Sequence, residues 1–533
     1  MLLSSRGLLI VFAACVHGAL AGSVWPKPLN QTSSHKVLLL NPDTFYFEAR
    51  EYDSSVLQDA FARYYTLIFS SPGYQPTGSQ AGERLRSARH EIKRLDVYVH
   101  SNDQSLNLNT PESYELTVAA PHSTIEAATV GLLLDTSRHF LPVLIIKDTL
   151  DAMAWAKLNV FHWHIVDDQS FPFVSERLPL LSLFGAFSPE HVYTPDDVRD
   201  VVAFARARGI RVVPEFDTPG HTLAWGKGYP DLLVDCCDAQ GQPTGAKGPM
   251  NPARNGTYTL LWSLLREVVE RFPDAYLHLG GDEVPFDCWQ SNPEVRDWMA
   301  SAGVADMAAL EQRFEERVLG LAAAAGRAYI VWQDVLDNGV QVRDDTVVHV
   351  WKWWWPVADG EGQPSTAGEA AQCRNGVPAG ACELSKGCCP ASGMAANDVP
   401  GWTHEMARVT QQGYKTLLSS PWYLNLGEMA SEDWATFYQV EPLGFEGTRE
   451  QHSQVMGGEA CVWGEYVDAT NVISRTWPRA AAVAERLWSD ASVRDLDQAR
   501  ARLSQHRCRM LARGLNAEPL GPGFCPGDDL LEV

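Results

Sequence analysis

Two adjacent carboxylates, Asp282 and Glu283, have the sequence setting that best fits acid–base chemistry. They follow the apolar run Tyr276–Leu279 and the pair Gly280-Gly281, which indicates a short buried strand whose end a ligand can approach closely. Neighbouring side chains point in different directions, so one carboxyl group can stay protonated in an apolar environment while the other stays ionised. The pattern predicts a general acid beside an electrostatic helper. An Asp-Glu pair without such flanks is usually a solvated turn.

The carboxylate pair must be positioned by a larger repeating framework. Apolar runs recur along the chain and helical patterns separate most of them, for example Leu144–Lys157 and Leu310–Ala325. Eight strands that alternate with helices predict a (β/α)8 barrel, an α/β fold. The eight predicted strands are Gly131–Leu134, Asn159–His164, Arg211–Glu215, Tyr276–Leu279, Ala328–Trp332, Thr346–Val350, Lys415–Ser419 and Glu459–Trp463.

Polar and aromatic residues follow the carboxyl end of every predicted strand. In a (β/α)8 barrel these ends meet at the face that carries function. Convergence of so many such residues on one mouth is hard to explain by packing alone. Besides the carboxylate pair, the residues are Asp135, Arg138, His164, Asp167, Asp168, Glu215, Asp217, His221, Trp332, Asp334, Trp351, Trp422, Tyr423, Asn425, Trp463 and Glu465.

The sequence divides into two predicted domains behind a leader. Residues 22–122 predict a small α/β domain, an antiparallel sheet with a helix at Ser54–Phe69 and strands at Leu95–Val99 and Tyr114–Val118. Residues 123–533 form the predicted barrel. Within it, residues 353–401 are rich in Gly, Ala, Pro and Cys and read as an insertion after the sixth strand, either a substrate rim or lid or a solvated loop.

The composition and the first residues of the chain limit the partners and the cellular compartment that we expect. The chain has 533 residues and a formal net charge of -23, which argues against nucleic acid and anionic membranes as partners. Residues 1–21 resemble a secretory signal, with Arg6, an apolar run and a small-x-small site at Ala19–Ala21. Two sequons, at Asn30 and Asn255, fit that route. We expect a protein of the secretory pathway without stable membrane insertion.

The cysteines predict disulfides rather than a zinc site. The predicted compartment is oxidising, and no paired Cys-x-x-Cys spacing is present. Cys508 and Cys525 can close a C-terminal loop, and Cys288 can reach either Cys236 or Cys237. Cys461 is expected to be a buried free thiol. Four more cysteines cluster in the insertion: Cys373, Cys382, Cys388 and Cys389.

Five segments resemble motifs of the β-N-acetylhexosaminidases of glycoside hydrolase family 20, most nearly the lysosomal branch. They occur in the family's order and the likeness covers nearly the whole mature chain. The resemblance implies a small N-terminal α/β domain before a (β/α)8 barrel, a terminal N-acetylhexosamine on a glycoconjugate as substrate, no cofactor or metal, a possible homodimer, and a lysosomal, vacuolar or extracellular location. The segments are Gly131–Arg138, Phe161–Asp168, Pro214–His221, His278–Val284 and Gly458–Glu465.

The resemblance also implies a mechanism. Ordinary retaining glycosidases use a protein carboxylate about 5 Å from the acid as nucleophile. This family uses the 2-acetamido oxygen of the substrate, which forms an oxazolinium intermediate with retention of configuration. Glu283 is then the general acid and base, and Asp282 holds the acetamido N–H and stabilises the charge that develops there.

The remaining roles are likewise implied by the matching motifs. Arg138, Glu465 and Asn425 would bind hydroxyls of the sugar, and Asp167 and His221 would support Glu283. The acetamido pocket and the sugar face would be walled by Trp332, Trp351 and Trp463, and Tyr423 would donate its hydroxyl to the acetamido oxygen.

Two departures from the family pattern carry expectations of their own. Only residues 121–130 join the last N-terminal strand to the first barrel strand, so the N-terminal domain is expected to lack an element. Leu426 stands where one type of subunit in vertebrate relatives has a basic residue, which predicts a preference for neutral glycans.

Two other functions stay open at this point. His162 and His164, with Asp167 and His221, could serve a metal-dependent barrel hydrolase, because alternation places both histidines on one side of their strand. A glycan-binding protein without activity could use the same barrel, although the intact Asp282-Glu283 pair argues against it.

Overall fold

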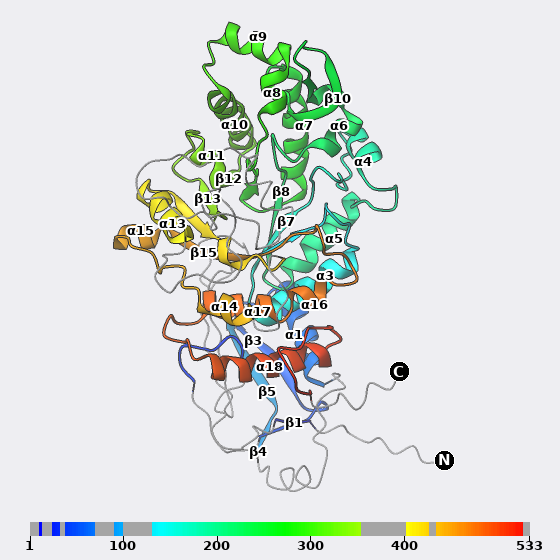
Figure 1. The fold of residues 1–533 in the computed structure, drawn as a ribbon. Helices are drawn as coiled ribbons and strands as arrows, with labels where there is room; N and C mark the ends of the chain where they lie inside the picture. Colours follow the sequence, from blue (N-terminus) through cyan, green and yellow to red (C-terminus); the bar gives the residue numbers. More distant parts are fainter. Residues whose placement is uncertain are drawn as a thin grey trace.

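A closed barrel of eight parallel strands forms the centre of the molecule (Figure 1). The computed structural model describes residues 10–12, 24–31, 38–69, 90–99, 131–352, 401–425 and 433–525. All eight predicted strands and the predicted (β/α)8 architecture are confirmed. The strands are β6 (Gly131–Asp135), β7 (Val160–His164), β8 (Arg211–Glu215), β11 (Tyr276–His278), β12 (Ala328–Trp332), β13 (Val347–Val350), β14 (Lys415–Leu418) and β15 (Val455–Val462).

The barrel strands are buried on both faces, which explains their nearly continuous apolar runs. Neighbouring strands pair in parallel around the ring, and β15 returns to β6, where Glu459 lies opposite Gly131. The last strand of the barrel therefore closes against the first, and all eight carboxyl ends open on one face.

Helices cover the outside of the barrel, and the two that periodicity predicts by range, Leu144–Lys157 and Leu310–Ala325, are present within three residues at each end. Helix α5 begins with a capping box in which Thr194 and Asp197 each accept a backbone N–H of the other, so its start is fixed by sequence. The helices between strands are α3 (Val143–Ala156), α4 (Leu180–Gly185), α5 (Pro195–Arg206), α6 (Leu223–Gly228), α7 (Asn255–Arg271), α8 (Asp287–Ser291), α9 (Pro293–Ala302), α10 (Met307–Ala324), α11 (Gln333–Asp337), α13 (Gly401–Gln411), α14 (Asp433–Gln439) and α15 (Arg449–Ser453).

Further elements extend the barrel at both ends. A hairpin after β8 pairs β9 (Leu233–Cys237) with β10 (Pro243–Met250) in antiparallel fashion. It lies near α8 at the end of the molecule opposite the N-terminal unit (Figure 1). The remaining elements are η1 (Pro230–Leu232), η3 (Ser420–Trp422), α16 (Val472–Thr476), α17 (Arg479–Trp488) and α18 (Leu496–Ala512).

The N-terminal unit corrects one expectation. Strand β3 (Tyr46–Glu51), helix α1 (Ser55–Phe69) and strand β5 (Arg94–Val99) follow one another, and β3 and β5 pair in parallel. The predicted antiparallel sheet is wrong for this pair, because a helix between two strands returns the chain in the same direction. A second sheet joins β1 (Ile10–Phe12), β2 (Leu38–Leu40) and β4 (His90–Ile92), in which only β1 and β2 are antiparallel.

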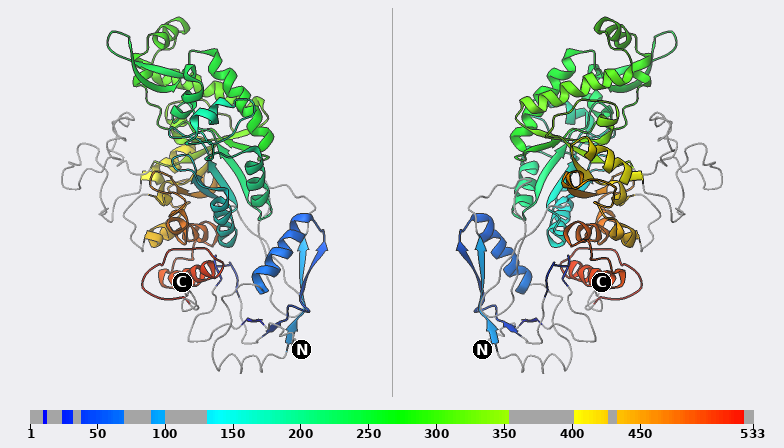
Figure 2. Two further views of the ribbon diagram at one scale, coloured as in Figure 1. Left: turned by 90° about the vertical axis from the view of Figure 1, so that its right-hand side faces the viewer. Right: turned by 90° about the vertical axis from the view of Figure 1, so that its left-hand side faces the viewer.

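The N-terminal segment is anchored on the barrel helices beside the unit that β3, α1 and β5 form (Figure 2). The indole of Trp25 is 4% exposed, donates to the carbonyl oxygen of Ala481 at 3.0 Å and stacks on His506. The guanidinium of Arg63 in α1 donates to the carbonyl oxygen of Ala207 at 3.0 Å. Residues before the barrel therefore bury apolar surface against α17 and α18.

The described cysteines resolve the open pairing. Cys236 is bonded to Cys288, and Cys508 is bonded to Cys525 as predicted. Cys461 is a buried free thiol, also as predicted, and Cys237 is free and partly exposed. The first bond ties β9 to α8, five residues after Glu283.

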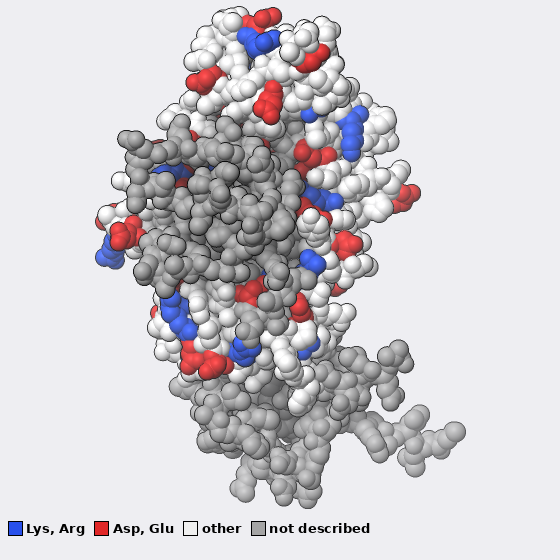
Figure 3. Space-filling view, in the orientation of Figure 1, with Lys and Arg blue, Asp and Glu red and all other residues white. Residues whose placement is uncertain are grey.

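Several expectations fall outside the described residues. These are the strand at Tyr114–Val118, the connection 121–130, Leu426 and the insertion except its last residue, Gly401, which begins α13. Among the described helices, none has both the length and the apolar character needed to cross a bilayer. Acidic and basic side chains are interspersed over the described part of the face in Figure 3, with no continuous basic patch there.

Candidate active site

The turn after β11 presents the two adjacent carboxylates. Gly280 and Gly281 have φ of 68° and 91°, and Glu283 has φ of 51°, so three of four consecutive residues are left-handed. A Cβ on Gly280 would lie 1.7 Å from Oδ1 of Asp217, and one on Gly281 would lie 2.3 Å from Val335. The two glycines are therefore required by both backbone conformation and space. A left-handed glutamate is uncommon, and such strain gathers at functional sites.

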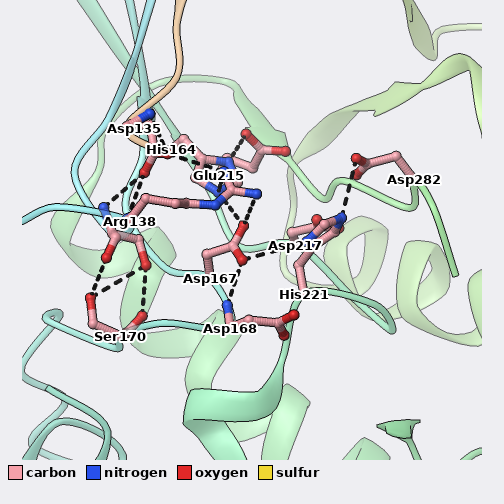
Figure 4. A network of polar contacts seen from close by, with 12 residues as sticks. Asp135, Arg138, His164, Asp167, Asp168, Ser170, Glu215, Asp217, His221 and Asp282 are labelled. Carbon is pink, nitrogen blue, oxygen red and sulfur yellow. Dashed lines mark hydrogen bonds and ion pairs between the residues drawn. The ribbon is translucent and has the colours of Figure 1, made fainter. Parts of the chain in front are cut away.

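His221 joins the exits of three strands. It also has a positive φ, of 54°, and lies in the turn that follows β8. Its Nδ1 lies 3.4 Å from Oδ1 of Asp167, and its Nε2 lies 3.5 Å from Oδ2 of Asp282 and 3.6 Å from Oε2 of Glu283. The structure thus brings His221 to the carboxylate pair and Asp167 to His221, and Figure 4 shows His221 between Asp167 and Asp282.

Arg138 is held by carboxylates from two strands. Its guanidinium lies 2.6 Å from Oδ2 of Asp167 and 3.1 Å from Oδ2 of Asp135 (Figure 4). It also lies over the ring of Trp463, 5.0 Å from the ring centroid. Asp135 also accepts the backbone N–H of Gly464 at 2.9 Å. Burial opposes the charge of Arg138, yet Asp167 and Asp135 raise its pKa, so the guanidinium stays charged.

Glu215 organises the floor of the barrel beneath the site. Its oxygens lie 2.6 Å from Nδ1 of His164, 3.0 Å from Nε2 of His162 and 3.1 Å from Nδ1 of His278, and accept the indole N–H of Trp332 at 2.8 Å. Burial opposes ionisation, but the three imidazoles lower the pKa of Glu215 well below its usual value. The contacts confirm that His162 and His164 point to the same side of β7.

Asp217 lies directly behind the carboxylate pair. It is fully buried and accepts the N–H of Gly281 at 2.9 Å, and atoms of Asp217, His221 and Asp282 lie within 4.8 Å of one another. Burial and the neighbouring Asp282 raise the pKa of Asp217 well above its usual value. A protonated Asp217 can donate a hydrogen bond to Asp282, which favours the ionised form of Asp282.

The charges around the pair therefore separate into distinct states. Burial disfavours the imidazolium form of His221, but Asp167 and Asp282 raise the pKa of His221 well above its usual value. Burial also opposes ionisation of Asp282, and His221 overcomes it and lowers the pKa of Asp282. The site holds an imidazolium against an ionised Asp282, and the negative carboxylate of Asp282 suits stabilisation of positive charge on a bound ligand.

Aromatic side chains form a separate apolar cluster beside these charges. Trp332, Trp351, Tyr423 and Trp463 are 1–8% exposed and pack together over Leu133 and Cys461. The rings of Trp332 and Trp463 have centroids 6.0 Å apart, and those of Tyr423 and Trp463 lie 6.1 Å apart. The four aromatic residues to which the resemblance assigns a role therefore meet in one place, although they come from four different strand ends, while Trp422 packs in the main core.

Two predicted residues lie further out. Asn425 is half-buried, and its Oδ1 has no hydrogen-bond partner within the described ranges. Glu465 is exposed but close enough to Arg138 to raise the pKa of that guanidinium. Burial raises the pKa of Tyr423 well above its usual value, so the Tyr423 hydroxyl remains a neutral donor.

The described residues contain three groups with enough nitrogen or carboxylate ligands to suggest a cation. His221 belongs to two of them, and its proton and ion pairs leave it a poor ligand. In the third, both ring nitrogens of His162 already face glutamates. These contacts fit ion pairing better than metal binding, which disfavours a metal-dependent hydrolase. The groups are His162, His278 and His349; Asp167, Asp168 and His221; and Asp217, His221 and Asp282.

Five acidic residues at this face had no predicted role: Asp135, Asp168, Glu215, Asp217 and Asp334. The last three are all buried, and each contacts a residue of the aromatic cluster or of the catalytic turn. The sequence feature that could have identified them is their position at the carboxyl ends of barrel strands. Sequence does not show whether such an acid touches a ligand or a neighbouring side chain. A small cavity at the opposite end of the barrel is lined mainly by apolar side chains, so it offers no comparable chemistry.

Comparison with known proteins agrees with this geometry. Residues 130–361 and 393–491 match the catalytic domain of glycosyl hydrolase family 20, and residues 24–133 match a beta-acetyl hexosaminidase-like family. The beta-hexosaminidase subunit beta of Homo sapiens is 39% identical over 553 residues, covering 95% of this chain and 90% of that protein. The subunit alpha of Bos taurus is 39% identical over 567 residues, covering 97% and 98%.

Solved structures share the fold. The chitobiase of Flavobacterium johnsoniae superposes with a TM-score of 0.69 at 24% identity, covering 92% of this chain and 73% of that one. The exo beta-N-acetylglucosaminidase of Vibrio harveyi superposes with a TM-score of 0.67 at 19% identity, covering 98% and 82%. From the family matches, the similarity over nearly the whole length and the arrangement of the site, the chain belongs to glycosyl hydrolase family 20 and is a hydrolase of the β-hexosaminidase type.

Proposed function

We propose that this enzyme removes terminal β-linked N-acetylglucosamine or N-acetylgalactosamine from glycoconjugates, with retention of configuration. The observation that carries the proposal is a cluster of buried aromatic side chains next to an Asp-Glu pair whose aspartate has a lowered pKa. Apolar rings suit contact with an acetamido methyl group, while the charge beside them suits the amide that becomes positive. The nucleophile is then the acetamido oxygen of the substrate itself.

Glu283 and Asp282 divide the chemistry. Glu283 protonates the leaving glycosidic oxygen as the glycosidic bond breaks and the acetamido oxygen bonds to the anomeric carbon. It then takes a proton from the water that opens the oxazolinium ring. Asp282 accepts the acetamido N–H and stabilises the positive ring, and Tyr423 donates its hydroxyl to the acetamido oxygen. The buried Asp217 and the imidazolium of His221 support this division, because both favour an ionised Asp282.

The surrounding residues position the sugar. Arg138 carries a permanent charge and several N–H donors, which suit hydroxyls of the terminal sugar, with Glu465 and Asn425 at the outer hydroxyls. Trp332, Trp351 and Trp463 wall the acetamido pocket and the sugar face. Asp167 and His221 hold Arg138 and the carboxylate pair in register. We further propose, from the resemblance and the predicted leader, a lysosomal, vacuolar or extracellular enzyme that acts on oligosaccharides or glycoconjugates as a homodimer.

Matched substrates test the proposal. We expect hydrolysis of a nitrophenyl N-acetylglucosaminide and no turnover of the nitrophenyl glucoside that lacks the acetamido group. Glu283→Gln should lower kcat by about 10²–10⁴-fold, since it removes the general acid and base. Asp282→Asn should lower kcat for the N-acetylglucosaminide, while the variant stays folded. Equal cleavage of the plain glucoside, or a covalent sugar ester on a protein carboxylate, would contradict the mechanism.

A further inference from the structure

The indole of Trp351 is tied to a buried acid on a neighbouring strand exit. Its Nε1–H donates to Oδ2 of Asp334 at 2.6 Å, and the two side chains are both largely buried. Asp334 follows Trp332 by two residues, in the first turn of α11. The segment from Trp332 to Asp334 therefore contains one tryptophan of the aromatic cluster and binds the indole of a second, Trp351.

The backbone of the same tryptophan is held from the same segment. Gln333 is fully buried, and its Oε1 accepts the N–H groups of Trp351 and Lys352, both at 3.0 Å. The other oxygen of Asp334 lies 3.0 Å from Nζ of Lys352. Main chain and ring of Trp351 are thus fixed together, which removes most of the freedom that a loop residue would keep.

The contacts close into a ring of polar side chains. Nζ of Lys352 also lies 2.6 Å from Asp337, which pairs with Arg408, and Arg408 lies 2.7 Å from Glu405. Nε2 of Gln333 donates to Glu405 at 3.0 Å and completes the ring. Acidic and basic groups alternate around it, so each charge has an opposite neighbour and Asp334 is held in place from behind.

We propose that Asp334 is a positioning residue that sets the width of the acetamido pocket by fixing the indole of Trp351. It does not touch substrate; it acts only through the tryptophan. The inference rests on the proposed function, in which Trp351 walls that pocket. A fixed wall rejects N-acyl groups longer than acetyl, because a rigid apolar pocket has no room for another methylene.

Selectivity between N-acyl groups measures this role directly. The ratio of kcat/KM for nitrophenyl N-acetyl- and N-propanoyl-glucosaminides should exceed about tenfold in the parent enzyme, the discrimination that one methylene supports. Asp334→Ala should bring the ratio toward one. Asp334→Asn keeps an acceptor of the same shape and should retain the parent ratio. Asp337→Asn, in the same ring but without contact to the indole, is the matched control and should also retain it.

A double-variant cycle guards against a merely structural effect. Trp351→Phe removes the indole N–H, so it should relax selectivity as Asp334→Ala does, and the combined variant should relax it no further. Additive effects, or an unchanged ratio in a folded Asp334→Ala enzyme, would overturn the inference. If the parent enzyme does not hydrolyse the N-acetylglucosaminide at all, the proposed function is overturned. This outcome differs from an unchanged selectivity ratio, which overturns only the role of Asp334.

Discussion

Glu283 and His221 both hold left-handed backbone conformations at the exits of neighbouring strands. Each such residue costs on the order of 1–3 kcal/mol and persists only where the surroundings fix it. Here the surroundings are the Gly280-Gly281 turn and the charges of Asp167 and Asp282. The strain has a use, since it directs a carboxyl and an imidazole toward one point between two strands.

Two glycine substitutions distinguish the cost of a left-handed backbone from the cost of a steric clash. Gly281→Ala places a Cβ in the left-handed region and 2.3 Å from Val335, so we expect large losses of stability and of kcat/KM. Gly209→Ala has a similar φ of 73° with no atom within 4 Å, so it should lower the free energy of unfolding by about 1 kcal/mol and leave activity unchanged. Denaturant titrations and kinetics of both variants would check this. Equal effects would show that space at Gly281 is irrelevant.

Residue types at the site were predictable, but their pairings were not. The motifs identified Asp282, Glu283 and the aromatic residues because each follows a barrel strand. They could not show that Glu215 holds Trp332 or that Asp217 backs Asp282. Those contacts depend on distances between strands that are far apart in the chain, and no spacing in the sequence encodes them.

At the scale of elements, one disulfide braces the catalytic loop and another does not. Cys236–Cys288 joins β9 to α8 beside the catalytic turn, whereas Cys508–Cys525 closes a loop from α18 to the C-terminal segment. The sequence separations are 52 and 17 residues. Both bonds restrict the unfolded chain, but only the first can restrain Glu283.

Paired serine variants test this difference. Replacing both Cys236 and Cys288 should lower the free energy of unfolding by about 4 kcal/mol, and replacing both Cys508 and Cys525 by about 3 kcal/mol, from loop entropy. Only the first pair should also reduce kcat. Thermal unfolding and kinetics below the transition measure both effects. A loss of kcat from the second pair alone would contradict the assignment.

The existence of elements was predictable where strands are buried on both faces or helices have a clear period. The eight barrel strands follow from continuous apolar runs, and α3 and α10 from their periodicity. The β3–β5 pairing was not predictable in the same way, since alternation within a strand says nothing about its partner's direction. The position of α1 between them decides it.

At the scale of the whole molecule, buried acids make the folded state more stable at low pH than at high pH. Burial raises the pKa of Glu311 to about 8 and that of Asp334 to about 6, and raises the pKa of Glu315 well above its usual value. Neither oxygen of Glu315 has a hydrogen-bond partner among the described residues. These acids bind more protons in the folded than in the unfolded protein, so their contribution to the free energy of unfolding falls as pH rises from about 4.5 to 8.

Unfolding as a function of pH checks this bias. The imidazoles with raised pKa, such as His162 at about 9, act in the same direction above pH 6.5. We expect the midpoint temperature to fall between pH 6.5 and 8, and Glu311→Gln to reduce that fall because a neutral amide replaces the acid. Glu316→Gln, exposed on the same helix, is the control. A rise in stability over this range would contradict the argument.

The contact between Asp135 and Gly464 has a consequence for synthesis. It joins positions 329 residues apart, at the seam where β15 closes on β6. During translation Asp135 and Arg138 are made early, whereas their contacts Gly464 and Trp463 are made only when most of the chain has been synthesised. A message cut short before that seam therefore yields no partly competent enzyme, since the binding site is the last part of the barrel to be assembled.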